Sequence, residues 1–299
     1  MEFKPPGPAD RLRAIGSTQR IPGTLAKALD PGDDFEPLPW PNPSDWLAVH
    51  PEPGQTYEEF VSSNWNRPDA HRQTIYLQPL GEFPPGRSPD LASLKDYAAG
   101  YFALPVQVLS PFARADQSLR SRLNPISRNR QLYTGDILAL ARSRLPADAF
   151  CLLAITMTDL YPDPAWNFVF GQASLRERVG VYSFARYDPA FYGEPRGPDY
   201  QILLLRRSCK VLVHETSHMF GLQHCIFFKC VMNGSNHLQE SDSRPLHLCP
   251  VCLRKLQYSI GFEVVDRYHR LLPLCQGLGF TDEAQWLKTR LARILKDQT

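Results

Sequence analysis

The chain has 299 residues, of which 43% are hydrophobic and 21% are charged. This balance is ordinary for a globular protein and excludes a fibre or a disordered chain, while the length allows one domain with two lobes or two modest domains. The formal net charge is only +2 and no long basic run is present, so electrostatics gives no reason to expect nucleic acid as the main partner. We expect a peptide or protein partner instead.

The N-terminal stretch MEFKPPGPADRLRAIG lacks the apolar core of a secretory signal, and no later run approaches the roughly 20 apolar residues that span a membrane. We therefore expect no membrane partner and a cytoplasmic or nuclear location. Such compartments keep thiols reduced, which favours metal binding by clustered cysteines. Three of the seven cysteines, Cys151, Cys209 and Cys275, are isolated in apolar surroundings and are expected to be buried.

Residues 1–43 contain nine prolines and little hydrophobic periodicity. This composition predicts a poorly ordered or loosely packed arm. From residue 44 the pattern becomes globular, with apolar runs of strand length alternating with helical patterns. The predicted elements are strands at 72–80, 105–110, 148–157, 166–174 and 179–187, and helices at 91–104, 134–145 and 201–220. This order predicts an α/β-like sheet with helices packed against it.

After Gly221 the sequence becomes a short, cysteine-bearing segment that extends to about residue 248. Helical patterns follow at 248–262 and 264–272, and a terminal amphipathic pattern covers 281–298, with Thr281 as its predicted N-cap. We therefore expect a smaller helical lobe after the main sheet.

The stretch HETSHMFGLQHC, residues 214–225, carries the densest chemistry in the chain. On a helix, His214 and His218 lie on one face with Cβ atoms about 6 Å apart, so both imidazoles can reach one ion. Gly221 suits a left-handed turn that ends the helix, and this turn lets His224 return as a third ligand. Three imidazoles with a fourth position for water are the coordination of catalytic zinc.

Glu215 is rotated about 100° from His214 on the same helix, which removes it from the ligand set but keeps it near a metal-bound water. Zinc lowers the pKa of that water toward about 7, and a carboxylate can accept its proton as it attacks a carbonyl. The rival interpretation is that these histidines fill a core or cap a helix. Chance gives the full HExxHxxGxxH pattern with a probability on the order of 1 in 10^5 for this composition, which disfavours that interpretation.

Four further cysteines form two close pairs, at positions 225 and 230 and at positions 249 and 252. This spacing is typical of a closed, tetrahedral zinc site with a structural role, formed by Cys225, Cys230, Cys249 and Cys252. The alternatives are a redox pair at Cys249 and Cys252 or two disulfides, and neither explains why four cysteines lie together. We expect two zinc ions per chain, and because His224 precedes Cys225 directly, the second zinc is expected to fix the third ligand of the first.

The histidine pattern resembles that of the metzincin metalloproteases, and its continuation HCIFFKCVMNGSNHLQESDSRPLHLCPVCLRKL is similar to the archaemetzincins, in which a four-cysteine zinc site follows the third histidine. The segments SDWLAVHPE and TMTDLYPDPAWNFVFGQASLRERVGVYSFARY carry the same resemblance, which covers roughly residues 44–272. Met232 matches the methionine beneath the catalytic metal of that family. Ser217 departs from it, because most relatives are expected to have glycine there.

The resemblance implies an α+β fold of metzincin type, with a mixed β-sheet, packed helices, an active-site helix and a smaller C-terminal lobe clamped by the four-cysteine zinc. It places a catalytic domain at residues 44–299, divided into a sheet and helix lobe, 44–221, and a zinc-clamped helical lobe, 222–299. An exposed edge strand within 165–186 is expected to hold a substrate backbone. His237 and Tyr182 are candidates for stabilising the oxyanion, although a structural role is the simpler interpretation for both.

The resemblance further implies an intracellular zinc metallopeptidase, a hydrolase with aminopeptidase-type cleavage, in which Glu215 activates the zinc-bound water. The alternative is a catalytically silent, zinc-stabilised protein-binding module with a blocked or partnered cleft. The presence of Glu215 favours the peptidase, because a purely structural histidine site does not require it.

Overall fold

The computed structural model describes residues 2–63, 66–112 and 118–296. The chain forms two compact units: unit 1 consists of residues 1–67 and 220–299, and unit 2 of residues 68–219. The predicted boundary at 221–222 agrees with the start of the second part of unit 1. The prediction places residues 44–67 in the sheet lobe, but in the structure this range belongs to unit 1, together with the C-terminal segment.

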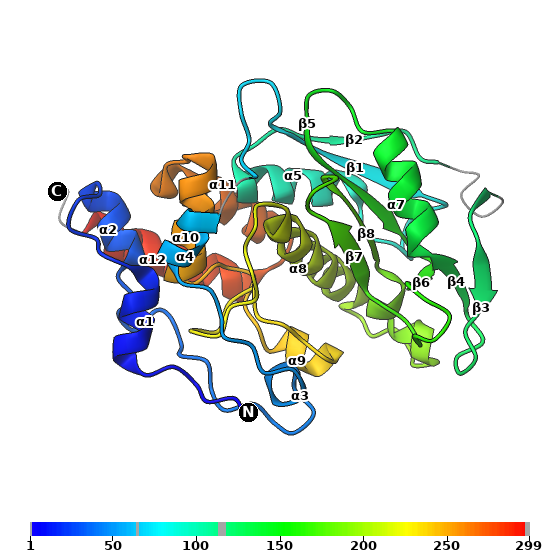
Figure 1. The fold of residues 1–299 in the computed structure, drawn as a ribbon, viewed down its shortest axis with the longest axis horizontal. Coiled ribbons are helices and arrows are strands. Elements are labelled where there is room, and N and C mark those ends of the chain that lie inside the picture. The colour runs from blue at the N-terminus through cyan, green and yellow to red at the C-terminus, as the bar shows by residue number, and fades with distance from the viewer. Residues whose placement is uncertain (1, 64–65, 113–117, 297–299) are drawn as a thin grey trace. The chain divides into compact units, whose positions relative to one another are not determined.

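Unit 2 is built on a five-stranded sheet with the order β2-β1-β5-β8-β7 (Figure 1). The first four strands are parallel and β7 is an antiparallel edge strand. A smaller sheet has the order β3-β4-β6. The strands are β1 (Thr74–Leu80), β2 (Val106–Val108), β3 (Ser121–Leu123), β4 (Arg130–Tyr133), β5 (Ala149–Thr156), β6 (Asp159–Tyr161), β7 (Gly171–Ser174) and β8 (Val179–Ser183).

Every residue of β5 and β8 is buried. Parallel strands of this kind need apolar cover on both faces, and helices supply this cover. One face, with Leu152 and Val179, packs against Ala141 of α7. The opposite face packs against α8, since Gly180 lies directly beneath Met219. The helices of unit 2 are α5 (Leu91–Phe102), α7 (Thr134–Ser143) and α8 (Tyr200–Met219), with short 3-10 turns at Ala185–Tyr187 and Pro189–Tyr192.

Unit 1 is helical and combines both ends of the chain (Figure 1). Its N-terminal helices are α1 (Pro8–Ile15), α2 (Gly23–Leu29), α3 (Trp46–Val49) and α4 (Tyr57–Ser63). Its C-terminal helices are α9 (Leu238–Asp242), α10 (Pro250–Ile260), α11 (Val264–Gly277) and α12 (Thr281–Leu295). None of the helices in the described residues is long and apolar enough to cross a membrane.

The prediction of a loosely packed arm at residues 1–43 is wrong for the part of the arm that the structure describes. Residues 2–43 form two helices, and apolar side chains such as Ile15, Leu29 and Phe35 are buried. The physical reason is Arg290 of α12, which is fully buried and donates hydrogen bonds to the carbonyl oxygens of Lys27, Ala28 and Asp30. The proline-rich backbone is therefore held by a partner about 260 residues away in the sequence.

Candidate active site and zinc centres

Helix α8 presents His214 and His218 on one partly exposed face, as their spacing predicted. The two Nε2 atoms lie 3.0 Å apart and the ring centroids 4.7 Å apart. Two nitrogens bound to one tetrahedral zinc at about 2.0 to 2.1 Å would be roughly 3.4 Å apart. The lone pairs of two neutral imidazoles repel at such a distance unless a cation or a proton lies between them, so this donor pair fits a zinc ion.

The remainder of α8 anchors these histidines to the sheet of unit 2. A Cβ atom on Gly180 would approach Met219 Cε to 2.9 Å, so the glycine allows close packing of the helix against β8. The hydroxyl of Ser217 is buried and donates to the Val213 carbonyl oxygen at 2.7 Å. The departure from glycine at this position is therefore accommodated inside the helix, where the hydroxyl satisfies its own hydrogen bond.

Glu215 is partly exposed and lies between the two histidines in sequence. Burial, with smaller contributions from the charges of Cys151 and Glu215, raises the pKa of the Tyr182 hydroxyl well above its usual value. Tyr182 is only 1% exposed. It is therefore a core residue of β8 whose hydroxyl is not accessible to a substrate carbonyl, which argues against the oxyanion role.

His224 belongs to unit 1, after Gly221 with its positive φ of 86° has turned the chain at the end of α8. Its Nδ1 atom lies 2.9 Å from Glu52 Oε1, and its ring meets the indole of Trp46 edge-on at 5.2 Å. A carboxylate that engages Nδ1 leaves Nε2 as the atom that can bind a metal. His214 and His218 belong to unit 2.

The four clustered cysteines come together in unit 1 as the sequence predicted. Their sulfur atoms all lie within 4.8 Å of one another, and Cys225 Sγ is 3.5 Å from Cys249 Sγ. A tetrahedral zinc with Zn–S bonds of about 2.3 Å needs sulfur atoms roughly 3.8 Å apart, so the cluster fits zinc. None of the seven cysteines, all of which lie in the described residues, forms a disulfide, and all are buried, which excludes the two-disulfide alternative and disfavours a reactive redox pair.

Backbone and side-chain hydrogen bonds shape this cysteine cluster. The N–H groups of Met232 and Cys249 donate to Cys230 Sγ at 3.5 and 3.2 Å, the kind of contact that stabilises a thiolate. The Asn233 amide donates to the carbonyl oxygen of Cys225 at 2.7 Å and accepts from the Cys230 N–H at 2.7 Å. Sequence reasoning missed Asn233, for which only its place between the cysteine pairs was a signal.

Met232 is fully buried beside this cluster, and its carbonyl oxygen accepts a hydrogen bond from the Cys225 N–H at 2.7 Å. The methionine that the resemblance marks, two residues after Cys230, therefore lies in the same tight turn as the cysteines. Its role as an apolar floor beneath the catalytic metal remains a proposal.

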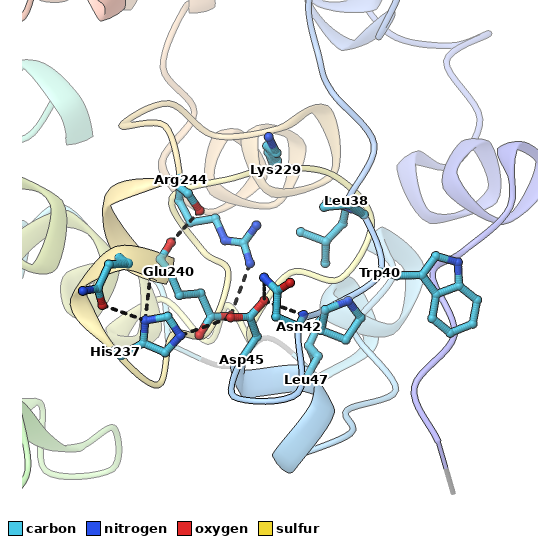
Figure 2. Close-up of a pocket in the computed structure, with 13 residues that line it drawn as sticks. Leu38, Trp40, Asn42, Asp45, Leu47, Lys229, His237, Glu240 and Arg244 are labelled. Atoms are coloured by element: carbon cyan, nitrogen blue, oxygen red, sulfur yellow. Dashed lines mark hydrogen bonds and ion pairs between the residues drawn. The ribbon is translucent and has the colours of Figure 1, made fainter.

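A third cluster of possible metal ligands is formed by Asp45, His237 and Glu240 (Figure 2). His237 Nε2 lies 3.1 Å from Asp45 Oδ1, and its Nδ1 accepts the Glu240 N–H at the start of α9. Glu240 accepts the Trp46 N–H at 3.0 Å and pairs with Arg244 at 3.3 Å. The three possible metal ligands are thus engaged with one another, with the backbone and with the Arg244 guanidinium. The cluster therefore joins α3 to α9, and His237 has a structural role.

Comparison with known proteins decides the family. The model of peptidase family M54 matches residues 143–258, a range that contains both the histidine and the cysteine motifs. Archaemetzincin-2 from Macaca fascicularis is 42% identical over 276 residues, covering 83% of this chain and 77% of that protein. The chain belongs to the archaemetzincin family. The resemblance that the motifs suggested is confirmed, and the chain is a zinc metallopeptidase, a hydrolase that acts on peptide or protein substrates.

Other archaemetzincins show more distant similarity. Human archaemetzincin-1 is 36% identical over 263 residues, covering 78% of this chain and 52% of that protein. A crystal structure of archaemetzincin from Methanopyrus kandleri has 29% sequence identity and a TM-score of 0.47, covering 65% of this chain and 99% of its own.

Proposed function

We propose that this archaemetzincin is an aminopeptidase-type enzyme in which His214, His218 and His224 bind the catalytic zinc and Glu215 is the proton acceptor. The main observation behind this proposal is that His214 Nε2 and His218 Nε2 lie 3.0 Å apart on α8, with the partly exposed Glu215 between them in sequence. Bound zinc supplies Lewis acidity, which makes water a stronger nucleophile and polarises the scissile carbonyl. Glu215 then takes the proton of the attacking water and delivers it to the leaving amine.

The cysteine cluster is proposed to hold a second, structural zinc, giving two ions per chain. Its sulfur positions support this proposal, because all four lie within 4.8 Å and fit a closed site. His224 and Cys225 are neighbours in sequence, so ordering of the cysteine site also restricts His224. An intracellular location is part of the same proposal, since a reducing compartment preserves four clustered free thiols.

We also propose that β7 holds the substrate backbone by β-augmentation. It is one of the two edge strands of the main sheet, and none of its residues is fully buried. An extended peptide can add to such an edge through main-chain hydrogen bonds.

The test is hydrolysis of a broad peptide library at neutral pH, with cleavage sites identified by mass spectrometry. We expect the wild-type protein to release N-terminal residues, and Glu215→Gln to lower the rate at least about 100-fold while its zinc content stays unchanged. Full activity in Glu215→Gln would exclude its role as proton acceptor. If the zinc-replete wild-type protein hydrolyses no peptide, the silent binding module is favoured instead. If N-acetylated peptides are cleaved equally well, only the aminopeptidase type of cleavage is contradicted.

A further inference from the structure

Within unit 1, the segment 46–55 lies along the segment 221–224 that carries His224. Glu52 is 172 residues from His224 in sequence, yet its two carboxylate oxygens lie 2.9 and 3.2 Å from His224 Nδ1. The two side chains are 27% and 21% exposed, so the contact is partly shielded from water. Such a carboxylate is a strong acceptor for the ring N–H of a neutral histidine.

Glu52 is itself held in place by an aromatic residue. The indole Nε1 of Trp46 donates to Glu52 Oε1 at 2.9 Å. The same indole is flanked by Gly234, where a Cβ atom would come within 2.5 Å of the ring, and it contacts the edge of the His224 ring. Trp46 therefore restricts both the carboxylate and the imidazole, and their relative orientation is fixed by packing as well as by hydrogen bonding.

The backbone before His224 is held by Gln55 of the same segment. The Gln55 side-chain amide donates to the Gly221 carbonyl oxygen at 3.3 Å and accepts from the Gln223 N–H at 3.2 Å. Lys255, which is 1% exposed, donates to Gln55 in turn. Gly54 has a φ of 73°, and a Cβ atom there would meet Ile226 Cγ1 at 2.6 Å, so the side chain of Ile226 packs directly against the Gly54 backbone.

We propose that Glu52 is a positioning residue for the zinc site, which accepts the Nδ1 hydrogen of His224 and so directs Nε2 toward the metal. This inference rests on the proposed function, in which His224 is the third zinc ligand. Carboxylates in this relation to a ligating histidine typically contribute 10- to 100-fold to metal affinity. Glu52 acts through His224 and touches neither the metal nor the substrate.

The test uses the full-length, zinc-replete protein with Glu52→Ala and Glu52→Gln. The matched control is Glu59→Gln, because Glu59 lies seven positions further along the chain and its carboxylate accepts hydrogen bonds from Thr56 at the start of α4. Chelator competition measures the dissociation constant of the exchangeable metal. The absorption spectrum of the protein with Co²⁺ in that site reports the geometry of the metal ligands. A variant that is merely less stable would keep the wild-type spectrum in its folded fraction.

We expect Glu52→Ala to weaken metal binding about 10- to 100-fold and to alter the Co²⁺ spectrum. Glu52→Gln is expected to lose less affinity, because its amide oxygen still accepts a hydrogen bond, and Glu59→Gln to remain within about threefold of the wild type. If folded Glu52→Ala keeps the wild-type metal affinity and the wild-type Co²⁺ spectrum, the inference is overturned. If the alanine variant does not fold, Glu52→Gln provides the test, because a neutral amide oxygen is a weaker acceptor than a carboxylate; an affinity and a spectrum identical to those of the wild type would then refute the inference.

The variant His224→Ala separates this inference from the proposal on which it rests. If His224→Ala leaves the affinity of the exchangeable metal unchanged, His224 is not a ligand and the proposed zinc site fails. If His224→Ala weakens binding but Glu52→Ala does not, the zinc site stands and only the positioning role of Glu52 is refuted.

Discussion

Arg290 has no solvent exposure, although its guanidinium carries a full charge. The charge is balanced by Asp34 at 2.6 Å, and the backbone carbonyl oxygens of Lys27, Ala28 and Asp30 accept hydrogen bonds from Nη2 of the same guanidinium. Removal of one partner of a buried pair leaves the other charge without compensation in a poorly solvated site. This side chain therefore connects the proline-rich N-terminal segment to α12 through both charge and hydrogen bonds.

We predict that Arg290→Met lowers the free energy of unfolding by about 3 to 5 kcal/mol and makes residues 27–34 sensitive to protease. The control is Arg293→Met, which also faces Asp34 at 3.2 Å but is 40% exposed, so its loss should cost less than about 1 kcal/mol. Urea unfolding and limited proteolysis with mass spectrometry measure both effects. Equal behaviour of the two variants would contradict the assignment of the arm's stability to the buried pair.

Residues whose partners are local in sequence were predictable, and residues with distant partners were not. The spacing of His214 and His218 follows from one helical turn, and the cysteine pairs carry their own ligand spacing, so both groups were identified from the sequence. Glu52 contacts His224 across 172 positions, and no spacing rule marks a single glutamate. For the same reason Arg290 was indistinguishable from the other basic residues of an amphipathic helix.

At the scale of the element, the N-terminus of α8 is anchored by a cluster around Asp188. Arg196 Nη2 and the Tyr200 hydroxyl donate to Asp188 Oδ2 at 2.6 and 3.0 Å, and the Ala190 N–H donates to Oδ1 at 2.9 Å. Burial opposes ionisation of Asp188, but these hydrogen bonds outweigh it and hold the pKa of the carboxyl below its usual value. The cluster fixes the first residue of the helix that carries His214 and His218.

We predict that Asp188→Asn destabilises the protein by on the order of 1 kcal/mol, a modest amount because Arg196 is 36% exposed and partly screened. A lowered folded-state pKa gives stability that is complete above the unfolded value of about 3.9 and is lost as pH falls through the folded value. The cost should therefore be the same at pH 7 and pH 5 in urea unfolding. A cost that disappears between these two pH values would show that another group is responsible.

Long elements were predicted well because their patterns are self-contained. The buried run at 148–157 became β5, and the pattern at 201–220 became α8, within one or two residues. The strands β3, β4 and β6 were missed, because each has three or four residues and depends on pairing with the others. Of the strand predicted at 166–174 only Gly171–Ser174 forms, and α12 is capped at Phe280 rather than at Thr281.

At the scale of the whole molecule, the glycine turn after α8 marks the boundary between the two units, and the sequence located it within two residues. The membership of residues 44–67 was not predictable, because it depends on contacts such as Trp46 with Glu240 and Gln55 with Gly221. These contacts join segments more than 160 residues apart. Of the three histidines of the motif, two lie in unit 2 and one lies in unit 1.

The central claim is that three imidazoles bind one zinc while four thiolates bind another. Anomalous diffraction at the zinc absorption edge, from crystals of the metal-replete protein, tests it directly. We expect two peaks per chain: one about 2.0 to 2.1 Å from nitrogens of His214, His218 and His224, and one about 2.3 Å from the four cysteine sulfurs. The two peaks should be more than about 6 Å apart, because separate ligands intervene. A single peak, a first site without His224, or two peaks about 4 Å apart as in a two-metal hydrolase would contradict the account.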